Sequence, residues 1–134
     1  MAIVALDEQE RVILVRQHRQ PAGAVLLEIP AGKLEVGEGP LACARREFGE
    51  ETSLKAEDWQ QLYVFYPSPG FSDEVIYLFR ASGLSREERP GSDPDENLEV
   101  VKIPLDEARE KIEEGEIVDG KTIIAIQQLL LKRK

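Results

Sequence analysis

Short runs of apolar and β-branched residues recur along this chain, and polar segments with glycine, proline or acidic residues separate them. Runs of this kind, bounded by turn-forming residues, are typical of β-strands. We therefore predict six strands, at residues 2–6, 11–18, 26–29, 59–66, 74–81 and 98–103. Pro67-Ser68-Pro69-Gly70 predicts a turn between the fourth and the fifth strand, and residues 85–97 predict a loop.

Three other segments have the features of helices, at residues 41–52, 105–114 and 119–132. Gly39-Pro40 precedes the first segment, and proline is well suited to the first turn of a helix. Gly115 ends the second helix, and Asp119 can cap the third. Strands with three interspersed helices predict an α/β protein, in which helices cover both faces of a mixed sheet in an α/β/α sandwich.

The first predicted helix has an acidic face beside its apolar one. At about 100° per residue, Glu47, Glu50 and Glu51 share one arc of the helix surface. Like charges three and four residues apart repel by a few tenths of a kcal/mol, and a divalent cation reverses that effect. Oxygen ligands suit Mg²⁺ or Mn²⁺. The alternative is that the glutamates are only the solvated side of an amphipathic helix.

These glutamates belong to a longer pattern of fixed spacing, G-x5-E-x7-R-E-U-x-E-E-x-x-U. Its positions are Gly32, Glu38, Arg46, Glu47, Phe48, Glu50, Glu51 and Leu54. The pattern resembles the Nudix box, the signature of enzymes that cleave a nucleoside diphosphate linked to another group. The family usually has glycine where this chain has Ser53. A left-handed residue commonly ends a helix there, so serine is expected to cost about 0.5–1 kcal/mol.

Outside the box, residues 16–19, 28–32 and 68–74 resemble the ADP-ribose pyrophosphatase branch of the Nudix family. The resemblance covers nearly the whole chain and implies one Nudix domain over residues 1–134, folded as the Nudix α/β/α sandwich. It also implies hydrolysis of ADP-ribose, or of a related nucleoside diphosphate sugar, to a nucleoside monophosphate and a sugar phosphate. Relatives commonly carry an additional β-rich segment at the front that contributes to a dimer and to the adenine pocket, whereas here the first predicted strand begins at residue 2. We therefore expect either a minimal version or a piece of a longer chain.

The resemblance implies a metal site. Glu47 and Glu51 are the expected direct ligands, Glu50 binds directly or through water, and the carbonyl of Ala31 supplies another oxygen. Arg46 lies one helical turn before Glu50, so we expect it to orient Glu50 rather than to act as a catalyst.

Substrate contacts are expected from two regions. Arg16 and Arg19 are candidates for the phosphates or the terminal ribose; alternatively they are exposed arginines at a strand end. Glu28 could accept from a ribose or a base amine, or it could be a local salt-bridge partner. In the later segment, Gly70 would shape a loop over the substrate, Phe71 would pack or stack, and Glu74 would reach a metal ion or the ribose.

A water nucleophile also needs a base. By resemblance the base lies on the loop before the last strand, where Glu96 is the first choice and Asp95 or Glu99 could fill the place. Pro94 stands where related sequences carry another acid. The alternative is that this loop is only a solvated acidic turn.

Composition limits the remaining classes. A net charge of −9 argues against a nucleic-acid partner, because phosphate backbones need clustered Lys and Arg. Cys43 is the only cysteine, which favours a reducing cytoplasm, and the sequence predicts neither a signal peptide nor a membrane span. The resemblance implies a homodimer. Two alternatives stay open: a Nudix hydrolase of another nucleotide sugar or a dinucleotide, and a catalytically silent module that senses a nucleotide.

Overall fold

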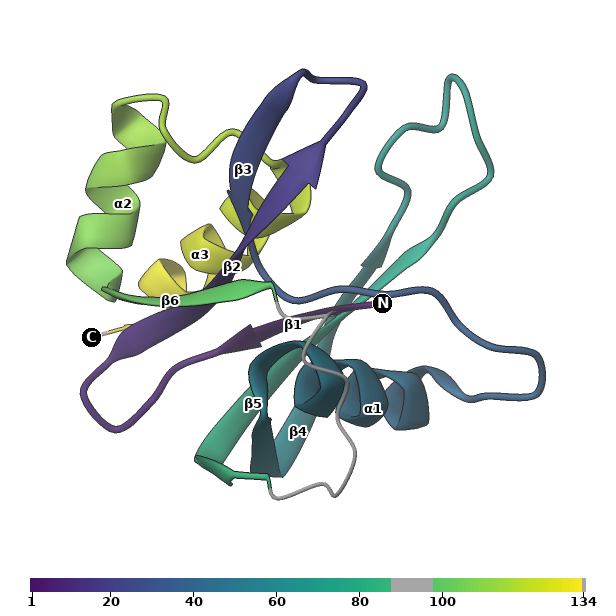
Figure 1. Cartoon of the computed structure of the whole chain (residues 1–134), viewed down its shortest axis with the longest axis horizontal. Coiled ribbons are helices and arrows are strands. Elements are labelled where there is room, and N and C mark those ends of the chain that lie inside the picture. Colours follow the sequence, from purple (N-terminus) through teal and green to yellow (C-terminus); the bar gives the residue numbers. More distant parts are fainter. Residues whose placement is uncertain (88–97, 134) are drawn as a thin grey trace.

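The computed structural model describes residues 1–87 and 98–133. Its strands are β1 (Ala2–Ala5), β2 (Arg11–Arg19), β3 (Ala24–Glu28), β4 (Leu54–Phe65), β5 (Ile76–Arg86) and β6 (Glu99–Pro104). Its helices are α1 (Pro40–Thr52), α2 (Leu105–Glu113) and α3 (Gly120–Lys132) (Figure 1). All the expected strands and helices are present, and Asp119 caps α3 by accepting from the backbone N–H of Thr122.

The largest difference from expectation is the length of β4 and β5. β4 begins at Leu54 instead of residue 59, and β5 extends to Arg86 instead of residue 81. The added residues pair with one another, from Leu54 opposite Arg86 to Asp58 opposite Ser82. Most of them are polar or small, so local pattern does not predict a strand there. The antiparallel pairing supplies their hydrogen bonds.

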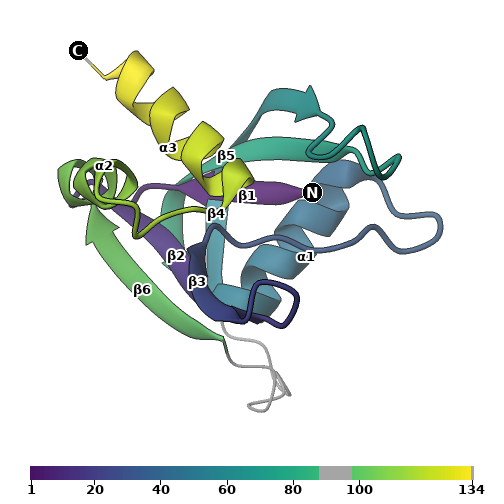
Figure 2. The same cartoon turned by 90° about the horizontal axis from the view of Figure 1, so that it is seen from above.

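The strands form two sheets, ordered β1-β5-β4 and β3-β2-β6. The first is mixed, because β1 runs parallel to β5 while β4 runs antiparallel to it. The second is antiparallel throughout. Figure 2 shows α1 and α3 on different sides of the strands. The expected mixed sheet is therefore confirmed, and a second sheet stands beside it.

Strand β1 divides the core into two clusters. Ala2 and Val4 pack in the cluster that contains residues of α3, whereas Ile3 and Ala5 pack in the cluster that contains residues of α1. Side chains of a strand alternate between its two faces, so each face of the mixed sheet carries one helix. This arrangement confirms the α/β/α sandwich.

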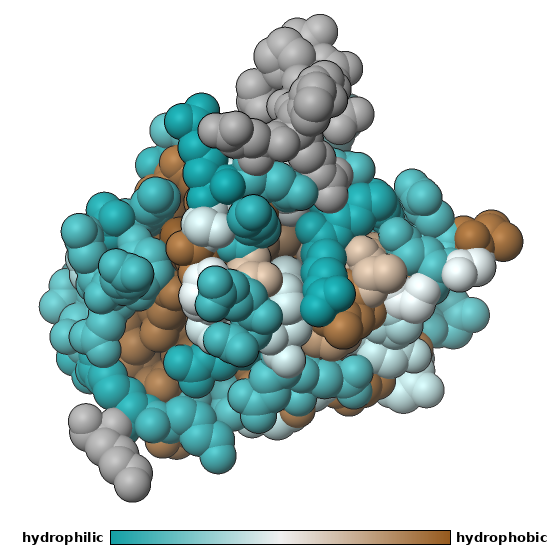
Figure 3. All heavy atoms as spheres, turned by 90° about the horizontal axis from the view of Figure 1, so that it is seen from below, coloured by the Kyte–Doolittle hydropathy of each residue, from teal (hydrophilic) through white to brown (hydrophobic). Residues whose placement is uncertain are grey.

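One face of the molecule is mostly polar (Figure 3). Figure 3 shows a largely hydrophilic face, with hydrophobic atoms visible in limited areas between the polar side chains. In the described part of the chain, none of the helices has the length and apolar character needed to span a membrane.

Ser53 at the end of α1 has a left-handed backbone, with φ 60° and ψ 27°. Ser53→Gly is therefore expected to raise the free energy of unfolding by about 0.5–1 kcal/mol, because glycine adopts this conformation without strain. Urea denaturation of the two proteins measures the difference. Lys55→Gly, an exposed strand position nearby, is the matched control and should destabilise the protein. A Ser53→Gly variant that loses stability would contradict the prediction.

Candidate active site

Helix α1 has a buried face and an acidic face. Phe48 on the buried face packs edge-on against Trp59, with ring centroids 5.8 Å apart. Because Phe48 fixes the rotation of the helix against the sheet, Glu47, Glu50 and Glu51 are held on the neighbouring side. The side chain of Glu47 is 16% exposed and that of Glu50 is 37% exposed.

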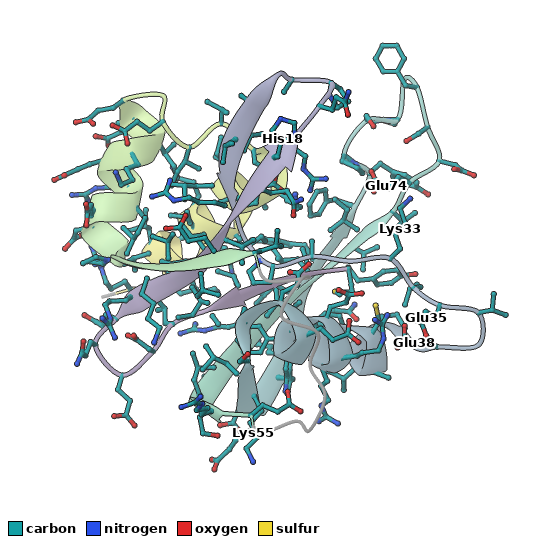
Figure 4. All side chains as sticks on the ribbon, in the orientation of Figure 1. His18, Lys33, Glu35, Glu38, Lys55 and Glu74 are labelled. Carbon is teal, nitrogen blue, oxygen red and sulfur yellow. The ribbon has the colours of Figure 1, made fainter. Side chains whose placement is uncertain are left out.

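Arg46 connects the acidic face to the loop before α1. Its Nε and Nη2 donate to both carboxylate oxygens of Glu38, at 2.8 and 3.0 Å. Its Nη1 donates to Glu47 at 2.9 Å and to Glu50 at 3.2 Å. The hydrogen bonds from Arg46 lower the pKa of Glu38 to about 2. Figure 4 shows Glu38 beside Glu35 on that loop. The expected ion pair between Arg46 and Glu50 is present, but the bidentate partner of Arg46 is Glu38.

Glu51 lies deepest of the three glutamates and points toward the segment after β3. Its Oε2 accepts from the backbone N–H of Ala31 at 3.1 Å. Burial raises the pKa of Glu51 to about 8, and the charge of Glu47 adds to that effect. Burial also raises the pKa of Glu47. Among the described residues, Glu51 has no ion-pair partner within 4 Å, so its ionised form would be poorly compensated there.

Gly32 packs directly against the side chain of Glu47. A Cβ atom at this position would overlap Cδ, Cγ and Oε1 of Glu47. The backbone N–H of Gly32 donates to the carbonyl of Met1 at 3.1 Å, which fixes the segment beside β1. Only glycine therefore leaves Glu47 where it is, and this explains the glycine at the start of the box.

The structure tests whether this region could hold a divalent cation. Within residues 1–87 and 98–133, no three His, Cys, Asp or Glu side chains are arranged as a metal-binding group. The reason is local: Arg46 holds oxygens of Glu47 and Glu50, while Glu51 turns toward Ala31. The donor set nevertheless fits a hard cation. It consists of oxygens only, and a buried carboxylate with a raised pKa is stabilised by added positive charge.

A cavity of about 660 Å³ lies next to this region. It is bounded by the ends of β2 and β3, the segment before α1, the loop before β5 and the start of α3. Ala31 and Gly32, which contact the glutamates of α1, form part of its wall. Lys33 and Glu74, labelled in Figure 4, bring opposite charges to it from two different loops. The cavity therefore adjoins the acidic face of α1.

The structure brings several of the predicted site residues together and leaves others apart. Four of them line the cavity: Arg19, Glu28, Ala31 and Glu74. Arg16 lies outside its wall and pairs with Glu99 across β2 and β6, at 3.0 Å. Phe71 is 98% exposed, and neither it nor Gly70 is part of the wall. Glu96, the expected base, lies outside the described residues, as do Asp95 and Pro94.

Sequence reasoning missed Lys33 and Lys121 as residues of the cavity, and it took Asp119 only as a helix cap. Lys121 donates to Glu28 at 2.7 Å and to Asp119 at 3.0 Å. Its partner Glu28 lies 93 positions earlier in the chain. No local sequence signal predicts a contact over that separation. The one available hint is that a lysine follows an acidic cap in the first turn of a helix, where it needs a further partner.

Cys43 is not part of this chemistry. Its side chain is buried in the cluster beside α1, and burial raises the pKa of the thiol to about 11. The thiol is therefore protonated at neutral pH and serves as a small core residue.

Comparison with known proteins gives a consistent result. The family model of the NUDIX domain matches residues 1–124. The methanol dehydrogenase activator of Bacillus methanolicus is 44% identical over 98% of this chain and 72% of its own length. The ADP-ribose pyrophosphatase of Bacillus subtilis (strain 168) is 43% identical over the same shares of both chains.

A solved structure agrees at the level of the fold. The crystal structure of an ADP compounds hydrolase superimposes with a TM-score of 0.83, over 96% of this chain and 68% of that one. The two sequences are 23% identical in the comparison, so this likeness bears on the arrangement of strands and helices.

Proposed function

The chain belongs to the NUDIX family, and from that premise we propose that it hydrolyses the pyrophosphate bond of ADP-ribose or a closely related nucleoside diphosphate sugar. The products are a nucleoside monophosphate, AMP from ADP-ribose, and a sugar phosphate. One observation carries this proposal: Glu47 and Glu51 of the box contact Gly32 and Ala31, which form part of the wall of a cavity large enough for a nucleotide, and Arg19 and Lys121 line the same cavity.

The reaction needs compensation of negative charge at the pyrophosphate. We propose that Mg²⁺, or Mn²⁺ in its place, supplies it, held by Glu47 and Glu51 with the Ala31 carbonyl, while Glu50 binds directly or through water. A divalent ion in such a site neutralises phosphate oxygens and lowers the pKa of water. The raised pKa of Glu51, which added positive charge would lower, and the space that Gly32 leaves for Glu47 support this assignment.

The protein's own side chains have separate parts in this proposal. Arg46 holds Glu47 and Glu50 against their mutual repulsion, because it donates to both. Arg19 offers its guanidinium to the phosphates from the wall of the cavity. Glu74 reaches the ribose or the metal ion from the opposite loop. Glu28 acts as the salt-bridge partner of Arg19.

Other parts of the proposal rest on the family resemblance. Glu96 is the proposed base for the water nucleophile. Gly70 and Phe71 are proposed to come over the substrate from the exposed loop before β5, and Arg16 to reach a terminal ribose. We also propose that the chain is a single catalytic domain, that it works as a homodimer in the cytoplasm, and that light scattering of the purified protein will give twice the mass of one chain.

A substrate panel tests the proposed function. The purified protein with Mg²⁺ is incubated with ADP-ribose, other nucleoside diphosphate sugars, dinucleotides and nucleoside triphosphates, and the products are separated by chromatography. AMP and ribose 5-phosphate from ADP-ribose are expected as the main products. Preference for a dinucleotide would change the substrate class and keep the chemistry. Binding of ADP-ribose without any turnover would instead indicate a nucleotide sensor.

A further inference from the structure

A closed set of hydrogen bonds joins the start of α3 to the end of β3. The backbone N–H of Ile29 donates to Oγ1 of Thr122 at 2.9 Å. Thr122 Oγ1 donates to Asp119 at 2.6 Å, and Asp119 accepts from Lys121 at 3.0 Å. Lys121 returns to the strand by donating to Glu28 at 2.7 Å. The position of Lys121 is therefore fixed by its own helix and by β3.

Glu28 receives two cations. Its Oε2 accepts from Arg19 Nε at 2.7 Å, and its Oε1 accepts both Arg19 Nη2 and Lys121 Nζ, each at 2.7 Å. The carboxylate of Glu28 is 2% exposed, and the side chain of Lys121 is 11% exposed. Burial alone would raise the pKa of Glu28, but the hydrogen bonds from Arg19 and Lys121 outweigh it and the pKa lies below its usual value. Glu28 is thus a buried anion whose orientation depends on both partners.

Arg19 is different from the other two, because its side chain is 46% exposed and faces the cavity. Nε and Nη2 are occupied by Glu28, which leaves Nη1 and the second N–H of Nη2 for a ligand. The plane of the guanidinium is set by the plane of the Glu28 carboxylate. Lys121 fixes that carboxylate, since it holds one of the two oxygens that Arg19 uses.

Charge makes a second contribution. Arg19, Lys121, Glu28 and Asp119 together sum to zero. Without Lys121, the group would carry one net negative charge beside a cavity that must accept a pyrophosphate. Lys121 therefore affects both the direction of Arg19 and the sign of the field around it.

From these contacts we propose that Lys121 is a positioning residue: acting through Glu28, it holds Arg19 in the orientation that binds the phosphates of the substrate. This inference rests on the proposed function. Lys121 donates two of its three N–H groups to Glu28 and Asp119, so we expect its main effect on the substrate to pass through Arg19.

The test is a double-mutant cycle with Lys121→Met and Arg19→Ala. Lys121→Met should raise KM for ADP-ribose about tenfold and change kcat less than about threefold, because binding is lost and the acidic face of α1 is untouched. In the Arg19→Ala background, the same Lys121→Met substitution should change KM less than about twofold, because residues that act through one another are not additive. Additive effects would overturn the proposal.

Two further variants separate positioning from folding. Lys121→Arg keeps the charge, so its KM should lie close to the wild-type value. If Lys121→Met raised KM only by disturbing the helix, Lys121→Arg would not be expected to restore it. Lys111→Met is the matched control, since it removes a lysine that pairs with Glu116 at 2.9 Å on the surface. It should leave KM unchanged. Thermal denaturation shows whether each variant is folded.

The outcomes distinguish this inference from the proposed function. Turnover of ADP-ribose with an additive cycle would leave the function standing and remove the positioning role. If the wild-type protein turns over no member of the panel, the cycle is measured on equilibrium binding of inorganic pyrophosphate by calorimetry, with the same expected coupling. If the wild-type protein does not bind pyrophosphate either, both proposals fail.

Discussion

Glu51→Gln is expected to abolish nearly all turnover and, at the same time, to stabilise the metal-free protein. The carboxylate of Glu51 is buried beside Glu47, and its pKa is raised from 4.5 to about 8. Glutamine has the same shape, can still accept from Ala31, and carries no charge. We expect kcat/KM to fall on the order of a hundredfold to a thousandfold, as when a group that stabilises developing charge is lost.

The gain in stability depends on pH with a definite sign. A carboxyl whose pKa is raised on folding keeps its proton in the folded state after the unfolded chain has lost it. The free energy of unfolding of the wild-type protein should therefore fall as the pH rises from 4.5 to about 8. Glu51→Gln has no carboxyl at this position, so its free energy of unfolding should not show this fall with pH. One pKa unit corresponds to about 1.4 kcal/mol, so a gain of about 2 kcal/mol at pH 8 is a conservative expectation.

Thermal denaturation in EDTA and in Mg²⁺ measures both effects. In EDTA, Glu51→Gln should melt above the wild-type protein. In Mg²⁺, the wild-type protein should gain stability, by about 2.7 kcal/mol at a hundred times the dissociation constant, and the variant should gain much less. Glu113→Gln on the exposed side of α2 is the control and should show neither effect. A Glu51→Gln protein that melts below wild type in EDTA would be incompatible with this account.

Gly32→Ala is expected to reduce activity about tenfold to a hundredfold. Losses of this size are typical when a metal ligand loses its support or a group near the reacting atoms is displaced. The added methyl group would occupy the space of the Glu47 side chain. Because a glutamate side chain can rotate away from the added methyl group, we expect the protein to stay folded. Glu47 would then no longer lie in the position that the site needs. The melting temperature in EDTA should therefore change by only a few degrees, while the concentration of Mg²⁺ needed for half-maximal activity rises.

Gly39→Ala is the control for Gly32→Ala. It lies in the same segment, has a negative φ of −78°, and a Cβ there would meet nothing within 4 Å. Full activity in Gly39→Ala with a loss in Gly32→Ala would assign the effect to Glu47. Equal activity in both variants would show that Glu47 does not need its present position.

The sequence predicted the fold well where the signal is local. Three helix ends depend on only one or two residues each, and each has the expected conformation. They are the cap of α3 at Asp119, the start of α1 at Gly39-Pro40 and the end of α1 at Ser53. The acidic face of α1 also follows from spacing alone, because helical geometry fixes which side chains share a side. The matched family and the α/β/α arrangement agree with those signals.

What escaped prediction depends on distant contacts. The first residues of β4 and the last of β5 are strands because they pair with each other, and neither segment has a strong strand pattern of its own. The bidentate partner of Arg46 is Glu38 on the preceding loop, whereas helix spacing pointed to Glu50. Lys121 reaches Glu28 only because α3 folds back on β3. Such contacts are properties of the tertiary structure.

The hydrogen bond from Ile29 to Thr122 has a consequence for synthesis of the protein. It spans 93 positions, and the Lys121 contact with Glu28 spans the same separation. On a ribosome, the box and both sheets emerge before α3 does, yet Arg19 has only part of its support until residues 119–122 have left the exit tunnel. We therefore expect Arg19 to reach its full set of supporting contacts only after α3 has docked against the end of β3.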